Sequence, residues 1–129
     1  MHALRPPRIL VVDDEPAVRE LIMRALQGAG YEVVAVRDGE AGLDAAKSAG
    51  LPYDLVLTNS YMPTMSGEQL IGHLRQLFPH LPILHLDDLS QPIGPNAEKV
   101  PTLYKPFSIT VLLEAVALAI AERPAKSEA

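Results

Sequence analysis

Five polar residues stand where apolar runs of the sequence end, and the oxygen atoms of four of them suit the binding of a cation. They are Asp13, Asp14, Asn59, Asp87 and Lys105. Carboxylate and amide oxygens are ligands that Mg²⁺ and Ca²⁺ prefer. These residue types at the ends of four apolar runs therefore indicate one polar site.

The elements that must position these residues are expected to be strands, because the apolar runs are continuous rather than alternating. Such runs are typical of parallel strands that are covered on both faces. We expect strands at residues 9–12, 31–36, 55–57, 83–86 and 102–104, and helices within residues 16–29, 39–50, 66–78 and 108–120. This alternation predicts an α/β fold with a doubly wound parallel sheet, whose functional residues gather outside the carboxyl ends of the strands.

One segment, residues 88–101, breaks the alternation. It contains Pro92, Gly94, Pro95 and Pro101. Proline removes a backbone donor and clashes with the preceding turn of a helix, so no full helix can run through this segment. At most residues 96–100 are expected to form a turn, and the fourth helix of the sandwich is therefore predicted to be short or missing.

Composition limits the class of protein. The 129 residues suit a single domain, predicted at 1–122, with 123–129 as a solvated C-terminal tail or linker. The chain has no cysteine, which excludes thiol nucleophiles and zinc knuckles. Its net charge is −5 with no cluster of basic residues, so direct binding of nucleic acid is not expected. No apolar run approaches the roughly 18 residues of a membrane span. The first eight residues contain no long apolar core, so a secretory signal is not expected and the expected setting is cytoplasmic.

Four stretches of the sequence occur in order, each at a strand end. They are residues 9–16, 54–59, 62–67 and 104–107. Together they resemble the response regulator receiver domain of two-component signalling, and the resemblance covers roughly residues 8–121. It implies a flavodoxin-like five-stranded sheet of order 2-1-3-4-5, a role in phosphorelay signalling rather than as an enzyme, and a sensor histidine kinase or another signalling protein as partner. It does not indicate the oligomeric state.

The resemblance also implies roles for individual residues. In the family an acidic pair holds Mg²⁺, and Asp13 and Asp14 match that pair. Tyr61 matches the position whose backbone carbonyl also binds the metal, and Lys105 matches the lysine that contacts the phosphoryl group. Mg²⁺ is therefore the cofactor that the resemblance implies.

Three positions depart from the family pattern. The phosphoacceptor aspartate is replaced by Asn59, the hydroxyl residue that grips the phosphoryl group by Asp87, and the switch aromatic by Thr102. An amide is no anionic nucleophile and does not form an acyl phosphate at a useful rate, and a carboxylate at position 87 would repel a phosphoryl oxygen. These departures predict a degenerate receiver, or pseudo-receiver, that signals by protein–protein contact without phosphorylation.

Charge counting adds two hypotheses for the pocket. Asp13, Asp14 and Asp87 against Lys105 leave a formal charge of −2, because the acid gained at position 87 offsets the one lost at position 59. Carboxylates crowded together repel one another unless a positive charge lies between them. The pocket is therefore expected either to keep affinity for a cation or to form an ion pair between Asp87 and Lys105.

Two other functions are compatible with the sequence. One is a phosphorylatable receiver that carries an introduced Asp-to-Asn substitution at its acceptor position. The other, from a different class, is an Mg²⁺-dependent phosphohydrolase built on the same acidic cluster. The second is disfavoured because the sequence offers no second nucleophile or acid and no room for a cap domain.

Overall fold

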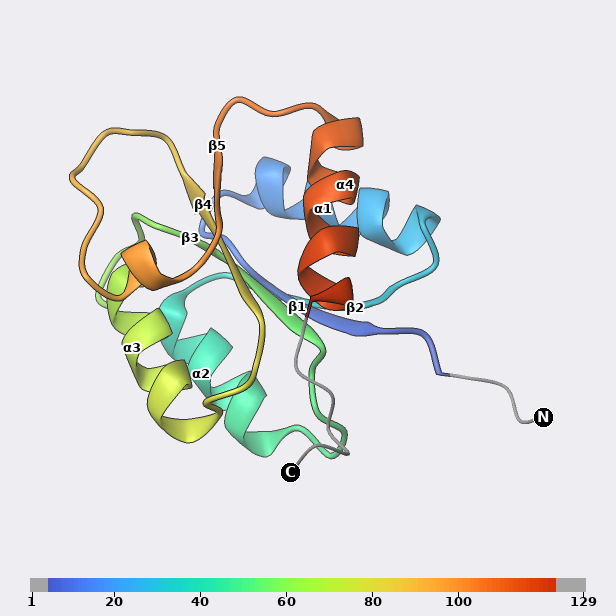
Figure 1. The fold of residues 1–129 in the computed structure, drawn as a ribbon, viewed down its shortest axis with the longest axis horizontal. Helices are drawn as coiled ribbons and strands as arrows, with labels where there is room; N and C mark the ends of the chain where they lie inside the picture. Colours follow the sequence, from blue (N-terminus) through green and yellow to red (C-terminus); the bar gives the residue numbers. More distant parts are fainter. Residues whose placement is uncertain (1–4, 123–129) are drawn as a thin grey trace.

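A parallel sheet of five strands forms the centre of the molecule in the computed structural model, which describes residues 5–122 (Figure 1). The strands are β1 (Arg8–Val12), β2 (Glu32–Val36), β3 (Leu55–Asn59), β4 (Ile83–Asp87) and β5 (Thr102–Tyr104). Their order across the sheet is β2-β1-β3-β4-β5, and every neighbouring pair is parallel. The predicted fold class and strand order are confirmed.

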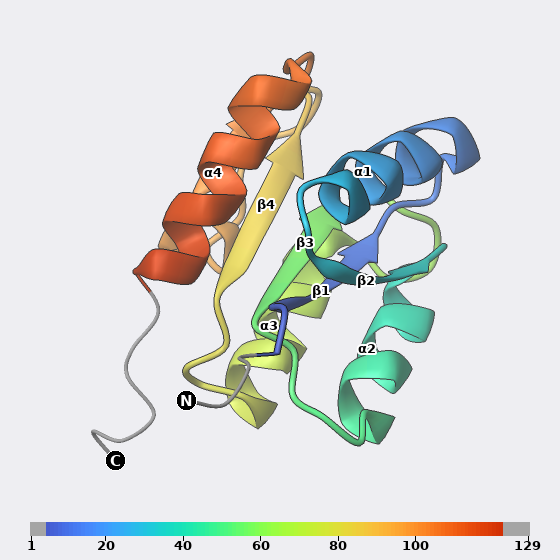
Figure 2. The same cartoon turned by 90° about the vertical axis from the view of Figure 1, so that its right-hand side faces the viewer.

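Four helices cover the two faces of this sheet. They are α1 (Pro16–Gly28), α2 (Gly39–Ser48), α3 (Gly67–Leu77) and α4 (Ile109–Ala121). Helices α1 and α4 lie on one face, and α2 and α3 lie on the other (Figure 2). Strand β1 is buried on both sides, since Ile9 and Val11 pack towards α1 and α4 while Leu10 and Val12 pack towards α2 and α3. This burial explains the continuous apolar run that the sequence shows there.

Side-chain caps fix where three of the helices begin. The carboxylate of Asp38 accepts a hydrogen bond from the backbone of α2, and the hydroxyl of Ser108 does the same for α4. Ser66 and Gln69 form a reciprocal capping box at the start of α3. These caps satisfy backbone donors that the first turn of a helix leaves free.

Residues 88–101, here called the 88–101 segment, contain only one turn of 3-10 helix, η1 (Ala97–Lys99). The prediction that the helix between β4 and β5 is short or missing is therefore confirmed. The segment is held on α3 by the Glu68 carboxylate, whose two oxygens accept hydrogen bonds from the backbone N–H groups of Asn96 at 2.7 Å and Ala97 at 2.9 Å. The approach is close enough that a Cβ atom on Gly94 would lie 2.5 Å from the carboxyl carbon of Glu68.

The ends of the chain bear on two predictions. Residues 123–129, predicted as a tail or linker, lie outside the described residues, and the domain boundary at residue 122 stays a prediction. Within residues 5–122 no helix combines the length and the apolar character needed to cross a membrane.

Candidate functional site

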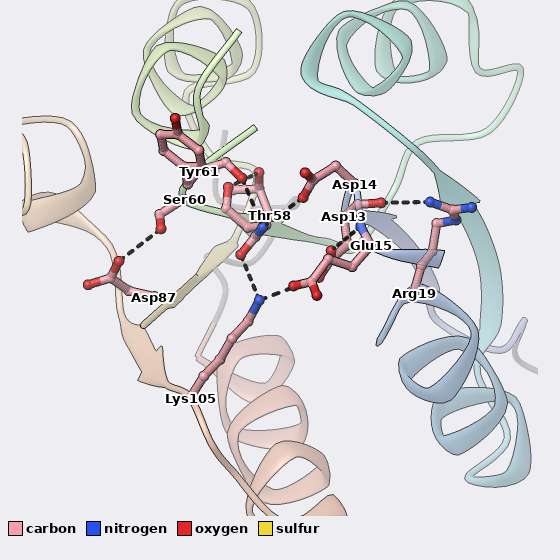
Figure 3. A network of polar contacts seen from close by, with 10 residues as sticks. Asp13, Asp14, Glu15, Arg19, Thr58, Ser60, Tyr61, Asp87 and Lys105 are labelled. Atoms are coloured by element: carbon pink, nitrogen blue, oxygen red, sulfur yellow. Dashed lines mark hydrogen bonds and ion pairs between the residues drawn. The ribbon is translucent and has the colours of Figure 1, made fainter. Parts of the chain in front are cut away.

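The polar residues singled out in the sequence meet at the carboxyl edge of the sheet (Figure 3). Asp13 follows β1, Asn59 ends β3, Asp87 ends β4 and Lys105 follows β5. Because these strands are parallel and adjacent, their last residues come to the same edge. The predicted convergence on one site is what the fold produces.

The Asn59 side chain lies at the centre of this site and is 7% exposed. Its Oδ1 accepts a hydrogen bond of 2.8 Å from Lys105 Nζ, and its Nδ2 donates to Asp14 Oδ1 and to the Tyr61 carbonyl oxygen, both at 3.1 Å. The opposite orientation of the amide would set an NH₂ group against an ammonium and an oxygen against two acceptors. The neighbours therefore determine which way the amide faces.

Asp13 is fully buried beside this network. Its Oδ1 accepts a hydrogen bond of 2.9 Å from the Glu15 backbone N–H, and its Oδ2 lies 3.7 Å from Lys105 Nζ without a hydrogen bond. Burial raises the pKa of the Asp13 carboxyl above its ordinary value, and the Glu15 hydrogen bond and the Lys105 charge act in the opposite direction. Lys105 thus links Asn59 and Asp13.

Asp87 is buried but forms no hydrogen bond with Asn59 or Lys105. Its Oδ1 accepts a hydrogen bond of 2.8 Å from Ser60 Oγ, and its Oδ2 is buried without a hydrogen-bond partner. The expected ion pair between Asp87 and Lys105 is wrong, because the Lys105 ammonium turns to Asn59 and Asp13 instead. Sequence reasoning missed Ser60; its position directly after Asn59, at a strand end, was the only signal.

Thr102 lies outside the Asn59 network. Its Oγ1 is 3.4 Å from His85 Nδ1 on the neighbouring strand β4. His85 is 2% exposed, and its Nε2 is buried without a partner. Burial lowers the pKa of His85, while the negative charges of Asp87 and Glu68 act to raise it. His85 is therefore a buried imidazole whose neutral form is favoured.

The lowered pKa of His85 predicts that the fold loses stability in mild acid. Above about pH 6.5 the ring is neutral in both states; as the pH falls below this value the unfolded chain takes up a proton that the folded chain resists, so the free energy of unfolding decreases until the pH passes the lowered pKa. Urea unfolding of the wild type and His85→Met between pH 7.5 and 5 measures this. The variant is expected to lose less stability than the wild type over that interval.

The matched control for this measurement is His73→Gln on the exposed surface of α3. Its dependence of stability on pH is expected to follow the wild type. A His85→Met curve parallel to the wild-type curve would contradict the assignment of this pH dependence to His85.

The predicted ligands of Mg²⁺ are close together but already bonded. Asp14 Oδ1 and the Tyr61 carbonyl both accept hydrogen bonds from Asn59, and Asp13 Oδ2 faces Lys105. Within residues 5–122 no three side chains of the histidine, cysteine, aspartate and glutamate types are arranged to hold a metal ion. In this arrangement the residues do not fit Mg²⁺, which requires a near-ideal octahedron of oxygen ligands.

The amino-acid sequence is similar to those of known response regulators. The chain is 35% identical to the response regulator protein FleR of Pseudomonas aeruginosa, over 94% of this chain and 26% of FleR. It is 40% identical to the response regulator MprA of Mycolicibacterium vanbaalenii, over 84% of this chain and 48% of MprA. The chain therefore spans only a quarter to a half of the length of these relatives.

Solved structures show the same architecture. The response regulator TrrA of Thermotoga maritima, whose structure is a complex with Mg²⁺-BeF, superposes with a TM-score of 0.80 at 34% identity, covering 88% of this chain and 98% of TrrA. The chemotaxis response regulator CheY4 of Vibrio cholerae gives a TM-score of 0.79 at 29% identity with the same coverage. The family model of the response regulator receiver domain matches residues 9–117. The chain therefore belongs to the response regulator receiver domain family, a family of signalling domains in two-component systems.

Proposed function

We propose that this receiver domain acts in two-component signalling without being phosphorylated at residue 59, and that it works through contact with a sensor histidine kinase or another signalling protein. The observation that carries the proposal is the bonding of the Asn59 amide to Lys105, Asp14 and Tyr61. The amide oxygen carries no full negative charge, and the Lys105 ammonium draws its electron density further away. Such an oxygen is a poor nucleophile towards phosphorus.

The surroundings of Asn59 support the same conclusion. The buried carboxylate of Asp87 stands where the family places a hydroxyl group, and its negative charge opposes the approach of a phosphoryl oxygen. Thr102, at the position of the switch aromatic, has no ring to rotate. The 88–101 segment is held on α3 through Glu68, by hydrogen bonds that do not involve Asn59. Pocket and segment therefore lack the coupling on which phosphorylation-dependent output relies.

A second candidate is a receiver that is competent for phosphorylation apart from its acceptor. The retained arrangement of Asp13, Asp14 and Lys105 around position 59 favours it. If this second candidate is correct, the single substitution Asn59→Asp restores transfer of a phosphoryl group to residue 59. No observation in the site favours the phosphohydrolase.

The test compares the wild type with Asn59→Asp after incubation with acetyl phosphate and Mg²⁺, with intact mass as the readout. The wild type is expected to gain no phosphoryl group. A phosphoryl adduct on Asn59→Asp alone would identify a pocket that lacks only its acceptor. No adduct on either protein would indicate that the other departures, Asp87 and Thr102, also prevent phosphorylation. An adduct on the wild type would overturn the proposal.

A further inference from the structure

We infer that the side-chain NH₂ group of Asn59 takes the place of the divalent cation in this pocket, so that the site is held together without Mg²⁺. The inference rests on the proposed function to the extent that both depend on Asn59. It concerns ion binding, however, and is tested without any phosphoryl donor.

The hydrogen bonds of Asn59 match the expected ligands of the cation. An amide NH₂ group has two hydrogens, and here they are donated to Asp14 Oδ1 and the Tyr61 carbonyl oxygen at the same distance of 3.1 Å. These are two of the three groups that the family pattern assigns to the metal. The two N–H groups carry partial positive charge and give each oxygen a hydrogen bond, so neither oxygen requires a cation as partner.

The third expected ligand, Asp13, is compensated by a different positive group. Its Oδ2 lies 3.7 Å from Lys105 Nζ, and the same ammonium donates to Asn59 Oδ1 at 2.8 Å. The groups thus alternate in sign from the Asp13 carboxylate through the Lys105 ammonium and the Asn59 amide to the Asp14 carboxylate. This alternation removes the repulsion between carboxylates that a cation would otherwise be needed to relieve.

Entry of Mg²⁺ would break this arrangement. The ion bonds oxygens at about 2.0–2.1 Å, so the NH₂ group would have to leave Asp14 and Tyr61. If the amide turned over to offer its oxygen, its NH₂ group would face the Lys105 ammonium, and Lys105 would lose its acceptor. A carboxylate at position 59 has no such conflict, because both of its oxygens accept hydrogen bonds and bind cations.

Calorimetric titration of Mg²⁺ at constant ionic strength tests the inference on three proteins. The wild type is expected to bind Mg²⁺ at least about tenfold more weakly than Asn59→Asp, since binding sacrifices a charge-assisted hydrogen bond. Gln76→Glu makes the same amide-to-acid change on the exposed surface of α3 and is expected to behave like the wild type. Wild-type affinity within about twofold of that of Asn59→Asp would overturn the inference.

A second measurement protects the test if Asn59→Asp folds poorly without metal. Urea unfolding is measured with and without about 10 mM Mg²⁺. The ion is expected to raise the urea midpoint of Asn59→Asp and to leave that of the wild type unchanged, because a ligand stabilises only a fold that binds it. An equal shift in both proteins would overturn the inference. Tight Mg²⁺ binding by a wild type that gains no phosphoryl group would refute the inference alone, and a phosphoryl adduct on the wild type would refute the proposed function alone.

Discussion

Gly67→Ala is expected to lower the free energy of unfolding by about 2–3 kcal/mol, the upper part of the range of about 1–3 kcal/mol for overpacked interiors. Gly67 begins α3 and is buried against the end of β3, where its backbone N–H donates to the Ser60 carbonyl at 2.8 Å. A Cβ atom there would lie 2.1 Å from the Asn59 carbonyl oxygen and 2.9 Å from Ser60 Cα. Both contacts are with backbone, so α3 must move away from the pocket.

The matched control is Gly28→Ala at the end of α1, where a Cβ atom meets no atom within 4 Å. This substitution is expected to leave stability unchanged or to raise it slightly, because alanine favours helix more than glycine does. Urea unfolding of both variants gives the comparison. Equal stabilities of the two variants would show that the start of α3 is free to shift.

Ser60→Ala is expected to cost about 2 kcal/mol, the usual range for a hydrogen bond to a charged group whose partner stays buried. The hydroxyl of Ser60 supplies the hydrogen bond to the buried Asp87 carboxylate, whose other oxygen has no partner. Without that hydroxyl, the Asp87 carboxylate stays buried but loses the hydrogen bond that offsets the cost of removing it from water. Most of the expected loss in the free energy of unfolding therefore comes from leaving a carboxylate buried without a hydrogen bond, and less from the contact itself.

A double-mutant cycle with Asp87→Thr separates these two effects, again by urea unfolding. In the Asp87→Thr background the cost of Ser60→Ala is expected to fall below about 1 kcal/mol, because no buried charge remains to be compensated. Ser48→Ala, on the exposed end of α2, controls for the loss of a serine hydroxyl and is expected to change little. If Ser60→Ala costs the same in both backgrounds, Ser60 does not act through Asp87.

The fold was predictable because its signals are local. A continuous run such as residues 9–12 marks a strand covered on both faces, and the prolines of the 88–101 segment rule out a helix whatever surrounds them. The attachment of that segment was not predictable. It depends on Glu68 meeting Asn96, and a contact across 28 positions in the chain leaves no periodic signal.

Most members of the candidate site were predictable, although Ser60 was missed and Thr102 lies outside it; the pairing of the members was not predictable. Parallel strands bring Asn59, Asp87 and Lys105 to one edge whatever their side chains do. Formal charge then suggested a pair between Asp87 and Lys105. Asp87 instead accepts a hydrogen bond from Ser60, and Lys105 donates one to Asn59 and lies beside Asp13. Charge counting omits hydroxyl and amide dipoles, and in this pocket those groups make the decisive hydrogen bonds.

The attachment of the 88–101 segment through Glu68 determines which kind of signal this surface can transmit to a binding partner. On the proposed function, no covalent event at residue 59 reaches the hydrogen bonds that hold Asn96 and Ala97. A partner that docks on this surface then meets the same shape before and after any stimulus. The information passed on would be the number of copies present in the cell, set by synthesis and degradation, rather than the modification of any one copy.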